Sequence, residues 1–130
     1  MGVEERLQRG ERLRQSADYL RCYRKGKRRS GRLALLYFIP NELGHPRFGI
    51  TASRKVGIAV RRQLVKRRLR EIYRRSGTRR QLPPVDLVVH LQPPAGSASF
   101  AELRAELERL LATLGSHSAG TPHADRPGRP

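Results

Sequence analysis

The stretch from residue 54 to residue 80 combines a dense positive charge with the apolar spacing of a buried helix. Twelve of its 27 residues are lysine or arginine, and Glu71 is its only acid. At about 100° per residue, its apolar side chains share one arc of a helix over 59–75. They are Val65, Leu69, Ile72 and Tyr73. Such a helix packs against a core, so the charge belongs to a folded domain and needs a polyanion opposite it.

The arc beside this apolar stripe carries cations with almost no interleaved acid. They are Arg62, Lys66, Arg67, Arg70 and Arg74. A solvated helix face usually mixes both signs of charge, so the pattern favours a binding surface over the alternative of a solvated face. Leu64 falls far from the buried arc and is expected to be exposed.

The basic residues are concentrated in two segments. Residues 21–32 hold seven of them and no acid, and together with the twelve in 54–80 they make 19 of the chain's 28. Residues 81–130 are close to neutral, with four basic and five acidic groups. Cations that serve general solubility would be dispersed, so the two clusters indicate binding.

Length and charge restrict the class of protein. With 130 residues, the chain is expected to form one domain. A net charge of +17 and a pI of about 11.6 favour a nucleic-acid partner first and an anionic membrane surface second. No run of 18 apolar residues is present to span a bilayer, and the N-terminus lacks a hydrophobic signal region. Cys22 is the only cysteine, so we expect no internal disulfide and a cytoplasmic location.

The first half of the chain predicts one helix and part of a sheet. A helix is expected over 17–25, with Ser16 as its N-cap. The apolar run 33–39 predicts a strand that is buried on both faces. Residues 47–53 and 86–92 alternate between apolar and polar side chains. Together they predict a sheet that helices cover on one side and that is partly open, with polar groups, on the other.

The last predicted helix begins with a capping box formed by Ser99 and Glu102. Leucines at helical spacing follow, and Gly115 is expected to end the helix. The remaining residues are rich in serine, glycine and proline, which predicts a disordered tail. The chain is thus expected to divide into a flexible N-terminus (1–11), a folded domain that binds nucleic acid (12–114) and the tail (115–130).

In their order and spacing, several motifs resemble those of the bacterial ribonuclease P protein subunit. The matching segments are YRKGKR (23–28), RFGITASRKVG (47–57), AVRRQLVKRRLRE (59–71), DLVVHLQPPA (86–95) and SFAELRAELERLL (99–111). The resemblance implies an α/β (α+β) two-layer sandwich, with a small mixed sheet and three helices. It also implies an unusual left-handed β-α-β crossover that carries the basic helix.

The resemblance further implies an activity. In that family a catalytic RNA removes the 5′ leader of precursor tRNA, and the protein subunit binds both the RNA and the leader. The RNA performs the hydrolysis with Mg²⁺, which it mainly holds itself, so neither catalytic nor metal-binding protein residues are expected. The implied partners are ribonuclease P RNA and precursor tRNA, with no membrane, and the protein is expected to be monomeric apart from the RNA complex. The alternative is a non-catalytic basic ribosomal or chromatin-type protein, which would bind RNA without dependence on a leader.

The motifs assign residues to two surfaces. The residues expected to bind the catalytic RNA are Arg54, Lys55, Arg61, Arg62, Lys66, Arg67 and Arg70. A cleft between the first helix and the sheet would bind the leader, with cations for phosphates and aromatic or polar groups for bases. Its residues are Tyr19, Tyr23, Arg24, Lys25, Arg47, Thr51, Ser53 and His90. For Tyr19, simple packing on the sheet is an equal alternative. Asp86 is expected at a strand edge or in a loop, and Cys22 as a small packing residue.

The chain departs from the family pattern at the start of the basic helix. The family has Arg-Asn-Arg where this chain has Arg62-Gln63-Leu64, so a leucine replaces one cation. The family also places an asparagine at position 58, where it would cap the helix. Ile58 has no side-chain acceptor, which costs about 1 kcal/mol.

Overall fold

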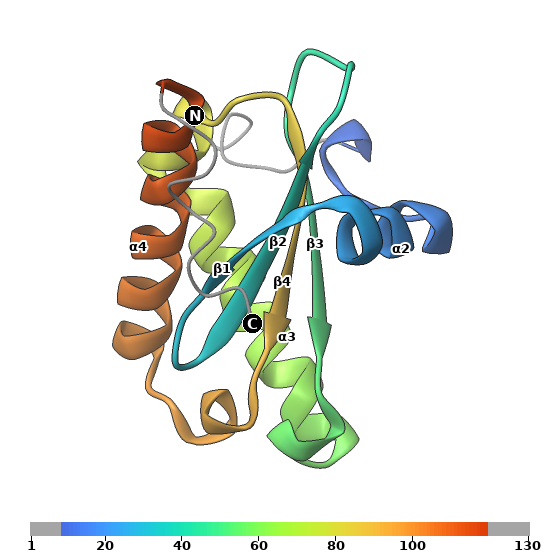
Figure 1. The fold of residues 1–130 in the computed structure, drawn as a ribbon. Helices are drawn as coiled ribbons and strands as arrows, with labels where there is room; N and C mark the ends of the chain where they lie inside the picture. The colour runs from blue at the N-terminus through green and yellow to red at the C-terminus, as the bar shows by residue number, and fades with distance from the viewer. Residues whose placement is uncertain (1–8, 120–130) are drawn as a thin grey trace.

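A computed structural model describes residues 9–119, which form a four-stranded sheet and three α-helices (Figure 1). The strands are β1 (Lys27–Ser30), β2 (Ala34–Pro40), β3 (Arg47–Ala52) and β4 (Val85–Leu91). The helices are α2 (Ser16–Lys25), α3 (Ala59–Arg75) and α4 (Phe100–Ala119). Short 3₁₀ turns occupy Arg9–Glu11, Arg54–Val56, Gly77–Gln81 and Pro93–Ser97. No helix among the described residues is long and apolar enough to cross a membrane.

The last strand of the sequence lies inside the sheet, because the strand order is β1-β2-β4-β3. β1 and β2 pair antiparallel, as do β2 and β4, whereas β3 and β4 are parallel. α3 connects these two parallel neighbours. In Figure 1, β3 and β4 both run downwards, β4 lies to the left of β3, and α3 passes behind them, which gives a left-handed crossover. Most β-α-β crossovers are right-handed, so general rules would have predicted the opposite hand. The family resemblance alone predicted this one.

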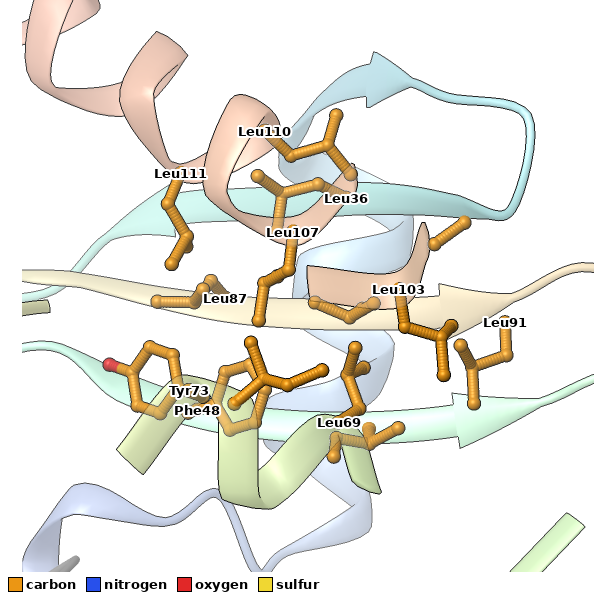
Figure 2. Close-up of a cluster of buried hydrophobic side chains, with 14 of the residues drawn as sticks. Leu36, Phe48, Leu69, Tyr73, Leu87, Leu91, Leu103, Leu107, Leu110 and Leu111 are labelled. Atoms are coloured by element: carbon orange, nitrogen blue, oxygen red, sulfur yellow. The ribbon is translucent and has the colours of Figure 1, made fainter. Parts of the chain in front are cut away.

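One face of the sheet is closed by α3 and α4, and we call it the apolar face. Alternate strand residues point to this side, including Leu36, Phe48 and Leu87, and they meet the leucine row of α4 (Figure 2). The ring of Tyr73 from α3 stacks on Phe48 with centroids 3.8 Å apart. Each large apolar side chain buried here contributes about 1.5–3 kcal/mol. This face therefore supplies most of the core.

The opposite face of the sheet, which we call the polar face, is partly covered by α2. A smaller cluster joins Cys22 of α2 to Leu13 and to Val88 of β4. Tyr19 lies directly over Gly49 of β3, where an added Cβ atom would come within 2.5 Å of the tyrosine hydroxyl. Cys22 is fully buried, and burial raises the pKa of its thiol to about 12. Its expected role as a packing residue is confirmed.

The basic helix has the predicted bounds, and the capping box of the last helix is confirmed. Ser99 N–H donates to Glu102 at 2.8 Å, and Glu102 N–H donates to the Ser99 hydroxyl at 3.0 Å. The expected end at Gly115 is wrong, because α4 continues to Ala119. A helical glycine costs only about 1 kcal/mol, which the buried leucines of the preceding turn outweigh.

Three other local expectations need correction. Ser16 is the first residue of α2 and not its cap; Gln15 precedes the helix without a side-chain cap bond. β2 is fully buried on its apolar side only, because α2 covers the other side incompletely. β1 was not expected at all, since its sequence KRRS has no apolar alternation. It forms by antiparallel pairing with β2.

Candidate nucleic-acid interface

The cations of α3 differ along its length. Among the described residues, Arg61, Lys66, Arg67 and Arg70 have no carboxylate partner. At the end of the helix, Glu71 accepts hydrogen bonds from Arg74 and Arg75, both at 2.7 Å. These bonds, led by the one from Arg74, lower the pKa of Glu71. The unbalanced charge of the helix is thus concentrated on its first three turns, where five of the predicted RNA-binding residues lie.

The loop that precedes α3 is built to hold the start of the helix. Arg62 donates to the carbonyl oxygen of Gly57 at 2.7 Å, so this predicted RNA ligand also fixes the loop. Gly57 has φ 152°, a conformation that other residues rarely adopt. The Ser53 hydroxyl accepts from Lys55 N–H at 3.2 Å and closes a 3₁₀ turn. Arg54 and Lys55 remain exposed on this turn, next to the basic helix.

A hydrogen-bond chain crosses the polar face of the sheet from α2 to β4. The hydroxyl groups of Tyr23 and Thr51 lie 2.7 Å apart, and Thr51 Oγ1 lies 2.8 Å from His90 Nδ1. The parallel register places Thr51 directly beside His90, which explains their contact. Burial lowers the pKa of His90 and raises that of Tyr23, so both side chains are neutral near pH 7. Three of the predicted cleft residues are therefore brought together as one polar row.

Tyr19 is held chiefly by packing. Its hydroxyl donates to the carbonyl oxygen of Leu13 at 3.3 Å, and its ring lies over Gly49. Burial raises its pKa, while the nearby charge of Arg70 acts in the opposite direction. Arg70 belongs to α3 and Tyr19 to α2, so the two predicted surfaces approach each other around the outer edge of β3. Arg24 and Lys25 are exposed at the end of α2.

Asp86 was expected at a strand edge or in a loop, but it is fully buried within β4, a strand in the interior of the sheet. Arg47 donates to both of its carboxylate oxygens, at 2.9 and 2.8 Å. Arg21 and Asn41 donate as well, at 2.9 and 2.8 Å. Burial alone would raise the pKa of Asp86, but these hydrogen bonds and the neighbouring guanidinium charges outweigh it and lower the pKa.

Arg47 is held by carboxylates and is mostly buried. Its guanidinium also lies 3.4 Å from Asp18, and only 20% of its side chain is exposed. Two carboxylates therefore already engage a residue that was predicted as a leader ligand. Sequence reasoning missed Arg21 and Asn41. The one available signal was the strand alternation that puts Arg47 and Asp86 on the same face, but only the register makes them neighbours.

No protein-held metal site is formed by the described residues, because no three histidine, cysteine or acidic side chains there are grouped to bind an ion. The one fully buried carboxylate, Asp86, is already occupied by two guanidinium groups and an amide. The donor set of residues 9–119 therefore does not fit Mg²⁺.

The comparisons with known proteins agree with this geometry. A family model described as Ribonuclease P matches residues 7–115. The ribonuclease P protein component of Nocardioides sp. is 40% identical over 121 residues, which cover 88% of this chain and 99% of that protein. The corresponding component of Acidothermus cellulolyticus is 39% identical over 107 residues, with coverage of 79% and 87%.

Solved structures give the same result. The RNase P protein of Staphylococcus aureus superposes with a TM-score of 0.72 at 31% identity, covering 79% of this chain and 94% of that one. The RNase P protein of Thermotoga maritima gives 0.70 at 33% identity, covering 79% and 96%. Identity at this level over most of each chain decides against the ribosomal or chromatin-type alternative. The chain therefore belongs to the bacterial family of ribonuclease P protein subunits, the partners of ribonuclease P RNA in tRNA 5′ processing.

Proposed function

We propose that this protein binds ribonuclease P RNA with the basic face of α3 and the 5′ leader of precursor tRNA with the cleft between α2 and the sheet. The observation that carries the proposal is the row of α3 cations without carboxylate partners in the described structure. Unbalanced charge of this density is stabilised by a polyanion. The second surface lies around the edge of β3 and offers hydroxyl, imidazole and phenol groups, which suit sugars and bases of a single strand.

Within the cleft, we expect the division of roles to follow the contacts described above. Arg24 and Lys25 are exposed and suit leader phosphates. Arg47 is paired with Asp86 and Asp18, so its main role is to hold α2 against β3 and β4. The Tyr23–Thr51–His90 row is expected to contact the sugars and bases of the leader.

The chemistry is proposed to belong to the RNA. The described protein residues offer no ion-binding cluster, so Mg²⁺ is expected on RNA phosphates, and no step is assigned to a protein side chain. The protein contributes binding energy and position. It is expected to act in the cytoplasm, as a monomer apart from its RNA complex.

Cleavage of precursor tRNA by the cognate RNA subunit tests the proposal. At a roughly physiological Mg²⁺ concentration of about 1 mM, the protein should accelerate leader removal. This acceleration should become smaller when the leader is shortened to one nucleotide. Lys66→Ala should weaken RNA binding, whereas Arg104→Ala on the exposed side of α4 is a matched control that removes the same charge. Equal cleavage with and without the protein would refute the proposal.

A further inference from the structure

An open groove of about 530 Å³ runs along the outward side of α3. Its lining residues are Ala59, Val60, Gln63, Leu64, Arg67 and Arg70. They recur at helical spacing on the side opposite the buried stripe. The volume lies within the range of about 300–1,000 Å³ that is typical of sites for small molecules and cofactors.

The floor of this groove is apolar, which is unusual in a surface so rich in cations. Val60 is 75% exposed, and Leu64, one turn further on, is half-buried and not exposed as its sequence position had suggested. A face that neutralised phosphates alone would have no use for these side chains. Single exposed apolar residues are common, but here two are adjacent on the helix and line one groove.

Cations stand at the far end of the same groove. Arg67 and Arg70 line it, and no carboxylate among the described residues pairs with either. Guanidinium groups bind phosphate through paired hydrogen bonds, and their planes also stack on bases. Gln63, between the apolar floor and the arginines, offers an amide that can hydrogen-bond to a base edge.

We infer that this groove receives an unpaired nucleobase of the partner RNA, with the adjoining phosphate on Arg67 and Arg70. The inference rests on the proposed RNA-binding role of α3 and adds what that face recognises. Duplex RNA hides its base faces and would leave Val60 and Leu64 in water. A second copy of the chain would bring the same cations against these arginines, so charge complementarity favours RNA over self-association.

The salt dependence of RNA binding separates an apolar contact from a phosphate contact. In the double variant Val60→Thr with Leu64→Gln, no charge changes and helix propensity is nearly retained. Affinity for ribonuclease P RNA should fall about 5-fold or more, because the variant removes apolar surface that would be buried against the base. The slope of log affinity against log salt should stay the same. Arg67→Gln should instead reduce this slope by about one unit.

Leu43→Gln is the matched control, because Leu43 is 51% exposed in the loop between β2 and β3, away from α3. It should bind RNA as the unaltered protein does. A second measurement compares competitors: an unpaired RNA oligonucleotide should lose affinity for the double variant, and a duplex of equal length should not. Thermal unfolding of each variant checks that the helix is intact.

Three results would overturn the inference: unchanged affinity of the double variant, a reduced salt slope in that variant, or equal loss for the unpaired and duplex competitors. A dimer in sedimentation that the double variant abolishes would also overturn it, because the groove would then hold a second copy. Failure of the proposed function looks different. In that case the unaltered protein itself would neither bind the RNA nor accelerate cleavage.

Discussion

The two faces of the sheet are made from the same strands but serve different purposes. On the apolar face, β2, β3 and β4 direct fully buried side chains against α3 and α4. On the polar face, the alternate residues of the same strands form the Asp86 cluster and the Tyr23–Thr51–His90 row. Because the side-chain period of a strand is two, each strand can supply the core and the proposed binding surface at once. Substitutions on the first face should thus change stability, and substitutions on the second should mainly change recognition.

The largest effect is expected on the apolar face. Leu87 is fully buried in β4, so Leu87→Ala should lower the free energy of unfolding by about 3–4 kcal/mol through lost burial and the remaining cavity. Urea denaturation would measure this loss. RNA affinity, measured at a temperature where the variant stays folded, should hardly change. A loss below 1 kcal/mol would mean that this face can collapse around the cavity.

Asp86→Asn tests whether the polar face also contains a structural element. The substitution removes the carboxylate partner of Arg21 and leaves Arg47 with Asp18 alone, so it should cost about 2–3 kcal/mol. This loss of stability is smaller than for a fully buried ion pair, because 40% of the Arg21 side chain is exposed. The same urea experiment applies. If stability is unchanged, the cluster serves recognition alone, and the distinction between the two faces becomes stricter.

The same carboxylate predicts a pH dependence. The pKa of Asp86 is lower in the folded protein than its ordinary value of 3.8, so the unfolded chain binds the proton more readily. Its contribution to stability is complete above pH 3.8 and is lost as the pH falls from there through the lower folded pKa. Comparing the stability of the unaltered protein and Asp86→Asn across this acidic range isolates the effect: the difference between them should shrink as the pH falls.

Thr51→Val should affect recognition more than folding. It removes the central hydroxyl of the polar row but keeps the shape of the side chain and suits a strand. Each lost hydrogen bond costs about 0.5–1.5 kcal/mol. Affinity for precursor tRNA with a leader should fall several-fold, on the order of 1 kcal/mol, while affinity for mature tRNA stays constant. Equal loss for both substrates would place the row outside the leader site.

The smallest change in free energy is expected for single cations of α3, and it should differ between the first three turns and the end of the helix. Lys66→Ala should lower the salt slope of RNA binding by about one unit, because an unpaired cation is lost. Arg75→Ala should lower it less, since Arg75 already pairs with Glu71 at 2.7 Å. Equal slopes for the two variants would show that the internal ion pair does not reduce the contribution of Arg75.

The parts of the fold that follow a strong period were predictable from the sequence. The bounds of α3 and the capping box of α4 rest on local spacing and were confirmed. β1 could not be predicted, because KRRS becomes a strand only by pairing with β2. The Asp86 cluster depends on the parallel register of β3 and β4, which brings Arg47 beside Asp86, and no local pattern encodes a register between strands about 40 residues apart. Leu64 was expected to be exposed because its angle on the helix is far from the buried arc, but it is half-buried. The assignment of residues to the RNA and to the leader remains a prediction.

The central position of β4 has a consequence for synthesis of the protein. β3 has β4 as its only strand neighbour within the sheet, and β4 follows it by more than 30 residues. On the ribosome, β3 and the basic helix are therefore made before β4, the strand that joins β3 to the rest of the sheet. Closing this long connection is an entropically costly step that local helix formation does not require. In a nascent chain, the most basic segment is consequently made before the sheet that it packs on can be completed.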